Sequence, residues 1–361
     1  MGQFGKKPRV NSSLWAWGTN GYGVLGLGNT NTQYSPVRVG LLTTWTSIVP
    51  GYRHSMALKS DGTLWAWGRN TNGQLGLGDV VNRSSPVQVG SLTTWTTIWG
   101  GWYQSFALQS NGTLWAWGYN TLGRLGLGDV AHRSSPVQVG ALTTWTSVAG
   151  NRYCSFALQS NGTLWAWGRG QYGGLGLGEA VNRSSPVQVG TLTTWTSIAT
   201  GNNHALALQS NGTLWAWGSG GDGGVGDGQA VARSSPVQVG TLTTWTSVAA
   251  HKYSSFALKS DGTLWAWGRN DFGRLGLEDM VFRSSPVQVG ALTTWTSVAA
   301  GVNHNLALKS DGTLWSWGSY NQGRLGLGGD LINRSSPVQV GALTTWTSVA
   351  GGNHSLALRR G

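Results

Sequence analysis

The sequence predicts an all-β protein: a closed seven-bladed β-propeller of four-stranded antiparallel blades, with one blade completed by both termini. A 50-residue repeat is the first observation, because Trp15 recurs at this step through Trp315 and another series runs from Trp45 to Trp346. Composition is the second. The 361 residues include 58 glycines and 23 tryptophans but only 24 basic and 12 acidic side chains, which excludes a coiled coil or a typical disordered chain. Seven repeats of this length indicate a propeller, a solenoid or an array rather than separate domains.

Each repeat contains four short runs rich in β-branched and aromatic residues, as is typical of strands. In one unit they are residues 87–89, 95–98, 106–108 and 114–117, and we expect them to form one blade in this order, so that the next blade begins at Pro136. The Leu-Trp-Ala-Trp run is apolar on both faces, so the sheet must be covered on both sides by neighbouring blades. Asn-Gly or Asp-Gly before this run is a hairpin signal, and no segment has the apolar period of a helix.

The two chain ends are the third observation, because they complement each other. The last repeat stops at Leu358 and Arg359, before its Leu-Trp-Ala-Trp strand, and the chain begins with that missing run at residues 14–17. The two ends therefore complete one blade, which closes the ring and removes exposed sheet edges. We expect a basic N-terminal tail at residues 1–10 and a single propeller over residues 11–361.

One full copy of the repeat motif runs from His54-Ser55-Met-Ala-Leu58 through the Gly-Thr-Leu-Trp-Ala-Trp-Gly segment to Gly76-Leu77-Gly78. This motif resembles the repeat of the regulator of chromosome condensation (RCC1) family. The resemblance implies seven four-stranded blades with strands shared between the termini. It is specific for fold and weak for function, because this fold hosts several unrelated binding roles.

The family's known activities fit this chain to different degrees. The best-known eukaryotic members exchange nucleotide on the small GTPase Ran through a wedge inserted between blades, and they dock onto nucleosomes. The even repeat spacing leaves no room for such an insertion, and the basic tail is reduced to Lys6, Lys7 and Arg9. Bacterial relatives include a secreted inhibitor that covers an enzyme's active site with one end of its propeller, a mode that the variation among the repeats fits better.

Differences among the seven repeats collect in three segments, which an up-and-down strand order places at one end of the ring. The links at the other end hardly differ, so drift in surface loops is the weaker interpretation. Large aromatic and arginine side chains gather at the variable positions, as in protein-binding hot spots. The candidate partner-binding residues are Tyr52, Arg53, Arg69, Trp99, Trp102, Tyr103, Tyr119, Leu122, Arg124, Arg152, Tyr153, Arg169, Tyr172, Lys252, Tyr253, Phe272, Arg274 and Phe282.

No pattern in the sequence indicates catalysis. Only two glutamates exist, Glu179 and Glu278, and neither has a partner at recurrent spacing for acid–base chemistry. His54, His204, His304 and His354 share one position of the repeat, where we favour a packing or hydrogen-bonding role over metal binding. Cys154 is expected to be an incidental thiol. We therefore predict no enzyme activity, no catalytic residues, no cofactor and no metal.

The net charge of +12 raises the alternative of nucleic-acid binding. The framework and terminal positions account for the whole excess, whereas the variable positions hold nine basic and nine acidic residues. We therefore favour a non-enzymatic, monomeric propeller that binds a protein partner, without membrane association and cytoplasmic by default, since no signal peptide is apparent. Two alternatives stay open: a basic nucleic-acid or chromatin binder, and a recently amplified or engineered consensus-like propeller with no defined ligand.

Overall fold

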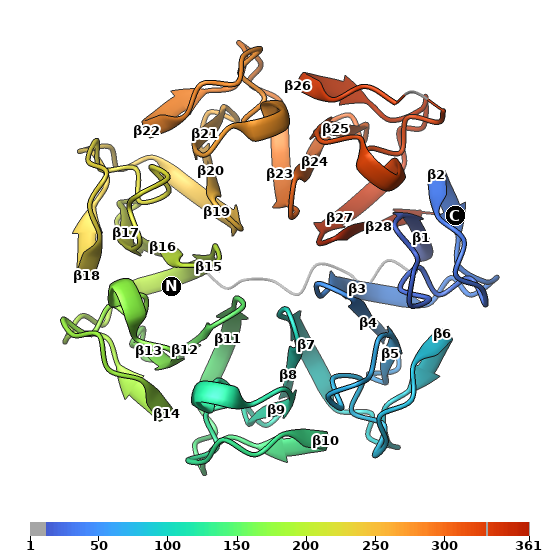
Figure 1. Ribbon diagram of the computed structural model, residues 1–361, viewed down its shortest axis with the longest axis horizontal. Helices are drawn as coiled ribbons and strands as arrows, with labels where there is room; N and C mark the ends of the chain where they lie inside the picture. The colour runs from blue at the N-terminus through green and yellow to red at the C-terminus, as the bar shows by residue number, and fades with distance from the viewer. Residues whose placement is uncertain (1–11, 330, 361) are drawn as a thin grey trace.

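The computed structural model describes residues 12–329 and 331–360. These residues form seven four-stranded antiparallel blades around a central axis (Figure 1). Blades 1 to 6 are β3–β6, β7–β10, β11–β14, β15–β18, β19–β22 and β23–β26, and blade 7 combines β27 and β28 with β1 and β2. The predicted closed seven-bladed propeller is confirmed. The predicted tail, residues 1–10, lies outside the described residues, and the domain division stays a prediction.

The strands occupy equivalent places in every blade. The innermost strands are β3 (Trp45–Pro50), β7 (Trp95–Gly100), β11 (Trp145–Gly150), β15 (Trp195–Thr200), β19 (Trp245–His251), β23 (Trp295–Ala300) and β27 (Trp346–Gly351). The second strands are β4 (His54–Lys59), β8 (Gln104–Gln109), β12 (Cys154–Gln159), β16 (His204–Gln209), β20 (Ser254–Lys259), β24 (His304–Lys309) and β28 (His354–Arg360).

The outer half of each blade follows the same plan. The third strands are β5 (Leu64–Gly68), β9 (Leu114–Gly118), β13 (Leu164–Gly168), β17 (Leu214–Gly218), β21 (Leu264–Gly268), β25 (Leu314–Gly318) and β1 (Ser12–Gly18). The outermost are β6 (Arg83–Gln88), β10 (Arg133–Gln138), β14 (Arg183–Gln188), β18 (Arg233–Gln238), β22 (Arg283–Gln288), β26 (Arg334–Gln339) and β2 (Gln33–Arg38). Four 3-10 turns are the only helical segments of the described chain: η1 (Thr121–Gly123), η2 (Gln171–Gly173), η3 (Asp271–Gly273) and η4 (Asn321–Gly323).

The grouping of strands into blades differs from the sequence expectation. The Arg-Ser-Ser-Pro-Val-Gln segment was expected to open a blade, yet β6 pairs with the preceding strand β5, with Gln88 opposite Trp65 and Arg83 opposite Gly68. It is therefore the outer edge of its blade, and the next blade begins at Trp95. A cyclic repeat has no intrinsic first strand, so only the pairing could decide this.

Ring closure takes place in blade 7. Strand β1 pairs along its whole length with β28, from Ser12 opposite Arg360 to Gly18 opposite His354. Its other edge pairs with β2, and Ser12 also bridges to Trp45 of blade 1. Both termini therefore supply strands to one blade, as the sequence predicted (Figure 1).

Large apolar side chains fill the space between adjacent blades. Between blades 1 and 2, Leu64 and Leu75 pack with Trp95 and Trp117 in one buried cluster. The Trp117 indole Nε1 donates a hydrogen bond of 3.0 Å to the Gln74 carbonyl oxygen of the preceding blade. Equivalent indole bonds recur in blades 1, 3, 5, 6 and 7, so tryptophan supplies both packing and a fixed link between blades.

Antiparallel pairing places the connections at two ends of the ring. We call loop face the end that carries the link between the first and second strands, such as residues 101–103, and the long link between the third and outer strands, such as residues 119–132. The opposite end carries the short uniform turns, such as residues 110–113. The segments that vary between repeats thus share the loop face. No helix within the described ranges has the length and apolar character needed to cross a membrane.

Candidate functional site

The predicted partner-binding residues differ in how far they reach solvent. Tyr172, Phe272 and Phe282 are exposed, by 53%, 42% and 48% respectively. Arg124 and Arg274 are buried, with only 4% and 2% exposed. The others are half-buried: Tyr52, Arg53, Arg69, Trp99, Trp102, Tyr103, Tyr119, Leu122, Arg152, Tyr153, Arg169, Lys252 and Tyr253.

One continuous group of these side chains spans blades 7, 1, 2 and 3. We call it the aromatic–arginine network; its members are Tyr22, Tyr52, Arg53, Arg69, Trp102, Tyr103, Tyr119, Arg124, Arg152, Tyr153 and Arg169. At its centre the Tyr52 and Trp102 rings stack 4.1 Å apart, only 5° from parallel. Tyr103 meets both rings edge-on, each at 6.3 Å, and continues to Tyr119 at 5.9 Å.

Arginine side chains lie over the faces of these rings. Arg152 covers Trp102 at 4.7 Å and Tyr153 at 5.1 Å, and Arg169 covers Tyr153 from 4.8 Å. Such contacts contribute about 0.5–1 kcal/mol at exposed sites and hold the guanidinium planes in place. The network is therefore a pre-arranged surface rather than a set of independent side chains.

A second group lies on blades 4 and 5 and is mostly ionic. Arg269 forms ion pairs with Asp271 and, at 3.8 Å, with Asp222. Arg274 lies 3.6 Å from the Asp271 carboxylate. Of the predicted residues, Lys252, Tyr253, Phe272 and Phe282 border this group through cation–π contacts. The structure thus divides most of the predicted site residues between two separate groups.

Four predicted residues have a strained, left-handed backbone, and one of them is Lys252 with φ of 47°. Leu122, Tyr172 and Phe272 share one position of the repeat and have φ of 69°, 58° and 63°. This left-handed conformation costs side-chain-bearing residues about 1–2 kcal/mol. Strain of this kind tends to gather at functional loops.

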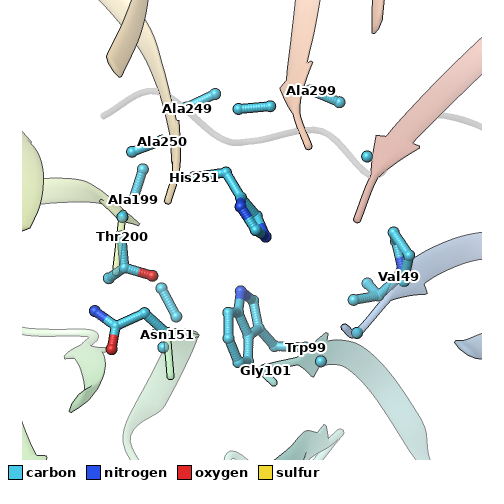
Figure 2. A pocket seen from close by; sticks show the side chains of 18 of the residues that line it. Val49, Trp99, Gly101, Asn151, Ala199, Thr200, Ala249, Ala250, His251 and Ala299 are labelled. Atoms are coloured by element: carbon cyan, nitrogen blue, oxygen red, sulfur yellow. The ribbon is translucent and has the colours of Figure 1, made fainter. Parts of the chain in front are cut away.

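Trp99 lies apart from the network, in the central channel. Its indole projects from β7 toward the His251 imidazole across the axis, between walls of small residues such as Ala199 and Ala299 (Figure 2). The cavity there has a volume of about 280 Å³. Burial, with smaller effects from Lys252 and Arg274, lowers the pKa of His251 to about 4.

The sequence-based selection missed several participants. Tyr22 receives a hydrogen bond of 2.9 Å from Arg53 and contacts Arg69, so it belongs to the network. Its repeat position is the one shared by Leu122 and Tyr172, a signal that could have found it. Asp222, Asp271 and Arg269 vary between repeats, but their ion pairing depends on the spacing between blades.

The four histidines of the shared repeat position lie inside blade interfaces. His354 Nε2 lies 2.6 Å from the Ser55 hydroxyl of the next blade, and the other three repeat this contact at 2.7–3.0 Å. Ser55 donates its own hydrogen to the Val24 carbonyl oxygen, so it accepts from the Nε2–H of His354. Across the described ranges, no three His, Cys, Asp or Glu side chains gather closely enough to hold a metal ion.

Fold and site together define a closed β-propeller whose blades are joined by buried tryptophan and histidine contacts and whose loop face displays aromatic and arginine side chains. The chain belongs to the RCC1 family. The sequence model of the RCC1-like domain matches residues 132–361, and that of the regulator of chromosome condensation (RCC1) repeat matches residues 11–58 and 61–108.

Solved structures show the same fold. Yeast RCC1 (Prp20), in its complex with Kap60, superposes with a TM-score of 0.86 at 23% identity, covering 98% of this chain and 91% of that one. Human WBSCR16 gives a TM-score of 0.85 at 22% identity, covering 97% and 99%. Prp20p from Saccharomyces cerevisiae gives 0.84 at 24% identity, covering 97% and 92%.

Proposed function

We propose that this protein is a non-enzymatic scaffold that binds a protein partner through its loop face. The aromatic–arginine network carries this proposal. It joins half-buried tyrosine, tryptophan and arginine side chains from four neighbouring blades into one surface, the residue types that dominate binding energy at protein interfaces. Preorganisation by stacking lowers the entropic cost of docking.

Two observations from relatives support a protein as the partner. Yeast RCC1 was crystallised with Kap60 bound, and the Prp20p structure was described together with its binding to Gsp1p and histones. Both structures are of Prp20, which shares the propeller fold with this chain.

Three acidic side chains of the loop face serve structure rather than catalysis. Asp79, Asp129 and Glu179 each form an ion pair with the arginine four residues later, at the start of an outer strand. Carboxylates held in this way fasten the long loops, and general acid–base chemistry would need one free to exchange a proton with a substrate.

The test uses immobilised wild-type protein and a loop-face double variant, Trp102→Ala with Tyr103→Ala. We expect the wild-type protein to retain a partner from extracts of the source organism at 0.3 M salt. We expect the double variant to retain at least tenfold less of this partner. Leu92→Ala with Leu142→Ala, in the turns of the opposite end, is the matched control, and equal melting temperatures establish that all three proteins are folded.

Two outcomes would contradict the proposal. Equal retention by wild type and the loop-face variant would exclude this face as the binding surface. Retention of nucleic acid with an affinity that falls steeply with salt would instead support the basic nucleic-acid binder, since phosphate contacts release counterions.

A further inference from the structure

The repeat places a buried arginine at the same position of blades 2, 5 and 6, and the surrounding charges differ between blades 2 and 5. In both, a buried arginine follows a left-handed residue and a glycine: Arg124 in blade 2 and Arg274 in blade 5. In blade 5, Asp271 pairs with Arg274, and Asp222 of the neighbouring blade faces Arg269. The corresponding residues around Arg124 are Thr121 and Asn72, so both carboxylates are missing there.

Arg124 is therefore a buried cation without an acidic partner among the described residues. Its Nε donates to the Thr121 carbonyl oxygen at 2.9 Å and its Nη1 to that of Arg152, and its guanidinium lies 4.8 Å from the Tyr119 ring centre. Burial lowers its pKa to about 10, which leaves the group charged at neutral pH. A buried charge is costly unless a counter-charge is present, so the site favours an anion.

A cavity opens beside this guanidinium. It has a volume of about 400 Å³ and lies between blades 1, 2 and 3. Arg69, Arg124 and Arg152 line it together with Tyr103, Tyr119 and Tyr153. Arginine forks recognise carboxylate and phosphate oxygens, and the tyrosine hydroxyls are further donors.

The surrounding acids do not neutralise these arginines. Asp79, Asp129 and Glu179, on the same three blades, are each paired with the framework arginine of their own outer strand. Within the part of the chain that the structure describes, neither Arg69 nor Arg152 forms an ion pair. The nine basic and nine acidic variable positions are therefore unevenly arranged. The arginines of this pocket, over blades 1 to 3, have no acidic partner in the described chain, whereas Arg269 and Arg274 of blade 5 are paired with Asp271.

We propose that the pocket over blade 2 binds an acidic side chain, aspartate or glutamate, presented by the protein partner. This inference rests on the proposed function and names the chemistry of that partner. The cavity suits one or two side chains rather than a strand of nucleic acid, because its three arginines surround one hollow. The neighbouring Tyr52 and Trp102 rings stack on each other, with Arg152 over the latter, so they offer no free platform for bases.

The test measures anisotropy of a fluorescein-labelled octaglutamate peptide on titration with the full-length protein at 0.15 M salt. Thr121→Asp copies the counter-ion that blade 5 already has. We expect it to weaken binding at least tenfold because it neutralises the pocket from within. Asn321→Asp is the matched control, since it adds the same charge at the same repeat position beside the buried Arg324 of blade 6. We expect less than a twofold change.

Arg152→Gln is a second variant for the case in which Thr121→Asp lowers the melting temperature. We expect Arg152→Gln to weaken binding of the peptide at least fivefold. Equal weakening by Thr121→Asp and Asn321→Asp would overturn the pocket in favour of general charge attraction. Tighter binding of a labelled eight-nucleotide DNA strand than of octaglutamate would overturn the acidic-protein assignment. If octaglutamate fails to bind while the Trp102→Ala, Tyr103→Ala variant still loses its partner, this inference fails and the proposed function stands.

Discussion

Buried histidine illustrates how single side chains connect the blades. Each of the four histidines that begin a second strand contacts a serine hydroxyl of the next blade, as in His54 with Ser105 at 3.0 Å. Where the repeat has another residue, the bond differs: Cys154 and Ser254 bond within their own blades, whereas a glutamine again reaches the next blade. The Gln104 amide donates to the Asn151 carbonyl oxygen of the next blade. The histidine position is thus an interface position, which favours the hydrogen-bonding interpretation over metal binding.

These histidines predict a loss of stability in mild acid. Burial lowers the pKa to about 4 for His54 and His204 and to about 3 for His354. The unfolded chain, with an ordinary histidine pKa near 6.5, therefore binds protons more readily than the folded protein. Stability is then full above about pH 6.5 and falls as the pH approaches 4. At pH 4.5 the cost is about 2.5 kcal/mol for each such histidine.

Urea unfolding at pH 7 and pH 4.5 measures this effect. His54→Gln, which copies residue 104 of the next blade, should narrow the difference in unfolding free energy between the two pH values. Carboxylates such as Asp61 have their pKa lowered by hydrogen bonds to Thr63, so their contribution is lost only below their ordinary range. Identical unfolding free energies of the wild type at the two pH values would refute the prediction.

Among the elements, the glycine turns after the third strand decide how closely blades approach. Gly76 has φ of +74°, and a Cβ atom there would lie 2.8 Å from the Trp117 Nε1 of the next blade. This nitrogen already bonds the Gln74 carbonyl oxygen, so there is no room for the indole to shift without losing that bond. Glycine is needed here for both conformation and space.

We expect Gly76→Ala to destabilise the protein by about 3 kcal/mol or more, from backbone strain of about 1–2 kcal/mol and the disturbed indole bond. Gly90→Ala is the control, because Gly90 has φ of +59° but open space around its added Cβ. It should cost only the backbone strain. Equal losses in chemical unfolding would show that contact with Trp117 contributes nothing.

For the molecule as a whole, stability depends on ring closure. Strand β1 supplies Leu14 and Trp17, both fully buried, and hydrogen-bonds to β28 and β2. Without β1, strand β28 becomes an open sheet edge. The burial of two large side chains, which stabilises the fold by about 1.5–3 kcal/mol each, is also lost.

Deleting residues 1–18 should therefore lower the melting temperature by at least about 5 °C, at ~2–4 °C per kcal/mol. A synthetic peptide of residues 12–18, which restores β1 between β28 and β2, should raise it again in a saturable manner. An unchanged melting temperature after the deletion would be incompatible with a blade shared by both termini.

Much of this architecture was predictable because the same short patterns recur in every repeat, so that they indicate both the strands and the arrangement of the blades. The Leu-Trp-Ala-Trp runs, the Asp-Gly turns and the complementary ends define strands, hairpins and closure by their pattern alone. The assignment of the Arg-Ser-Ser-Pro strand to a blade was wrong, because cyclic repetition leaves the strand pairing undetermined.

The site was predictable only as a set of positions. Comparison of repeats identified Tyr52, Trp102 and Arg152 as variable, but their contacts join blades 50 residues apart along the chain. The same comparison did not show that Arg274 forms an ion pair with Asp271 whereas Arg124 has no carboxylate beside it. Which charges are paired depends on distances that only the folded ring sets.

The sequence by itself determined the seven blades, the closure and the end of the ring that varies, because strand patterning and periodicity are properties of the chain. The tertiary structure decided how the variable side chains are distributed. It gathered tyrosine, tryptophan and arginine without acidic partners over blades 1 to 3, and it paired Arg269 and Arg274 with Asp271 over blade 5. The physical reason is that electrostatic and ring contacts act over a few ångströms between blades. Composition and net charge are sums over the whole chain and contain no information about such distances.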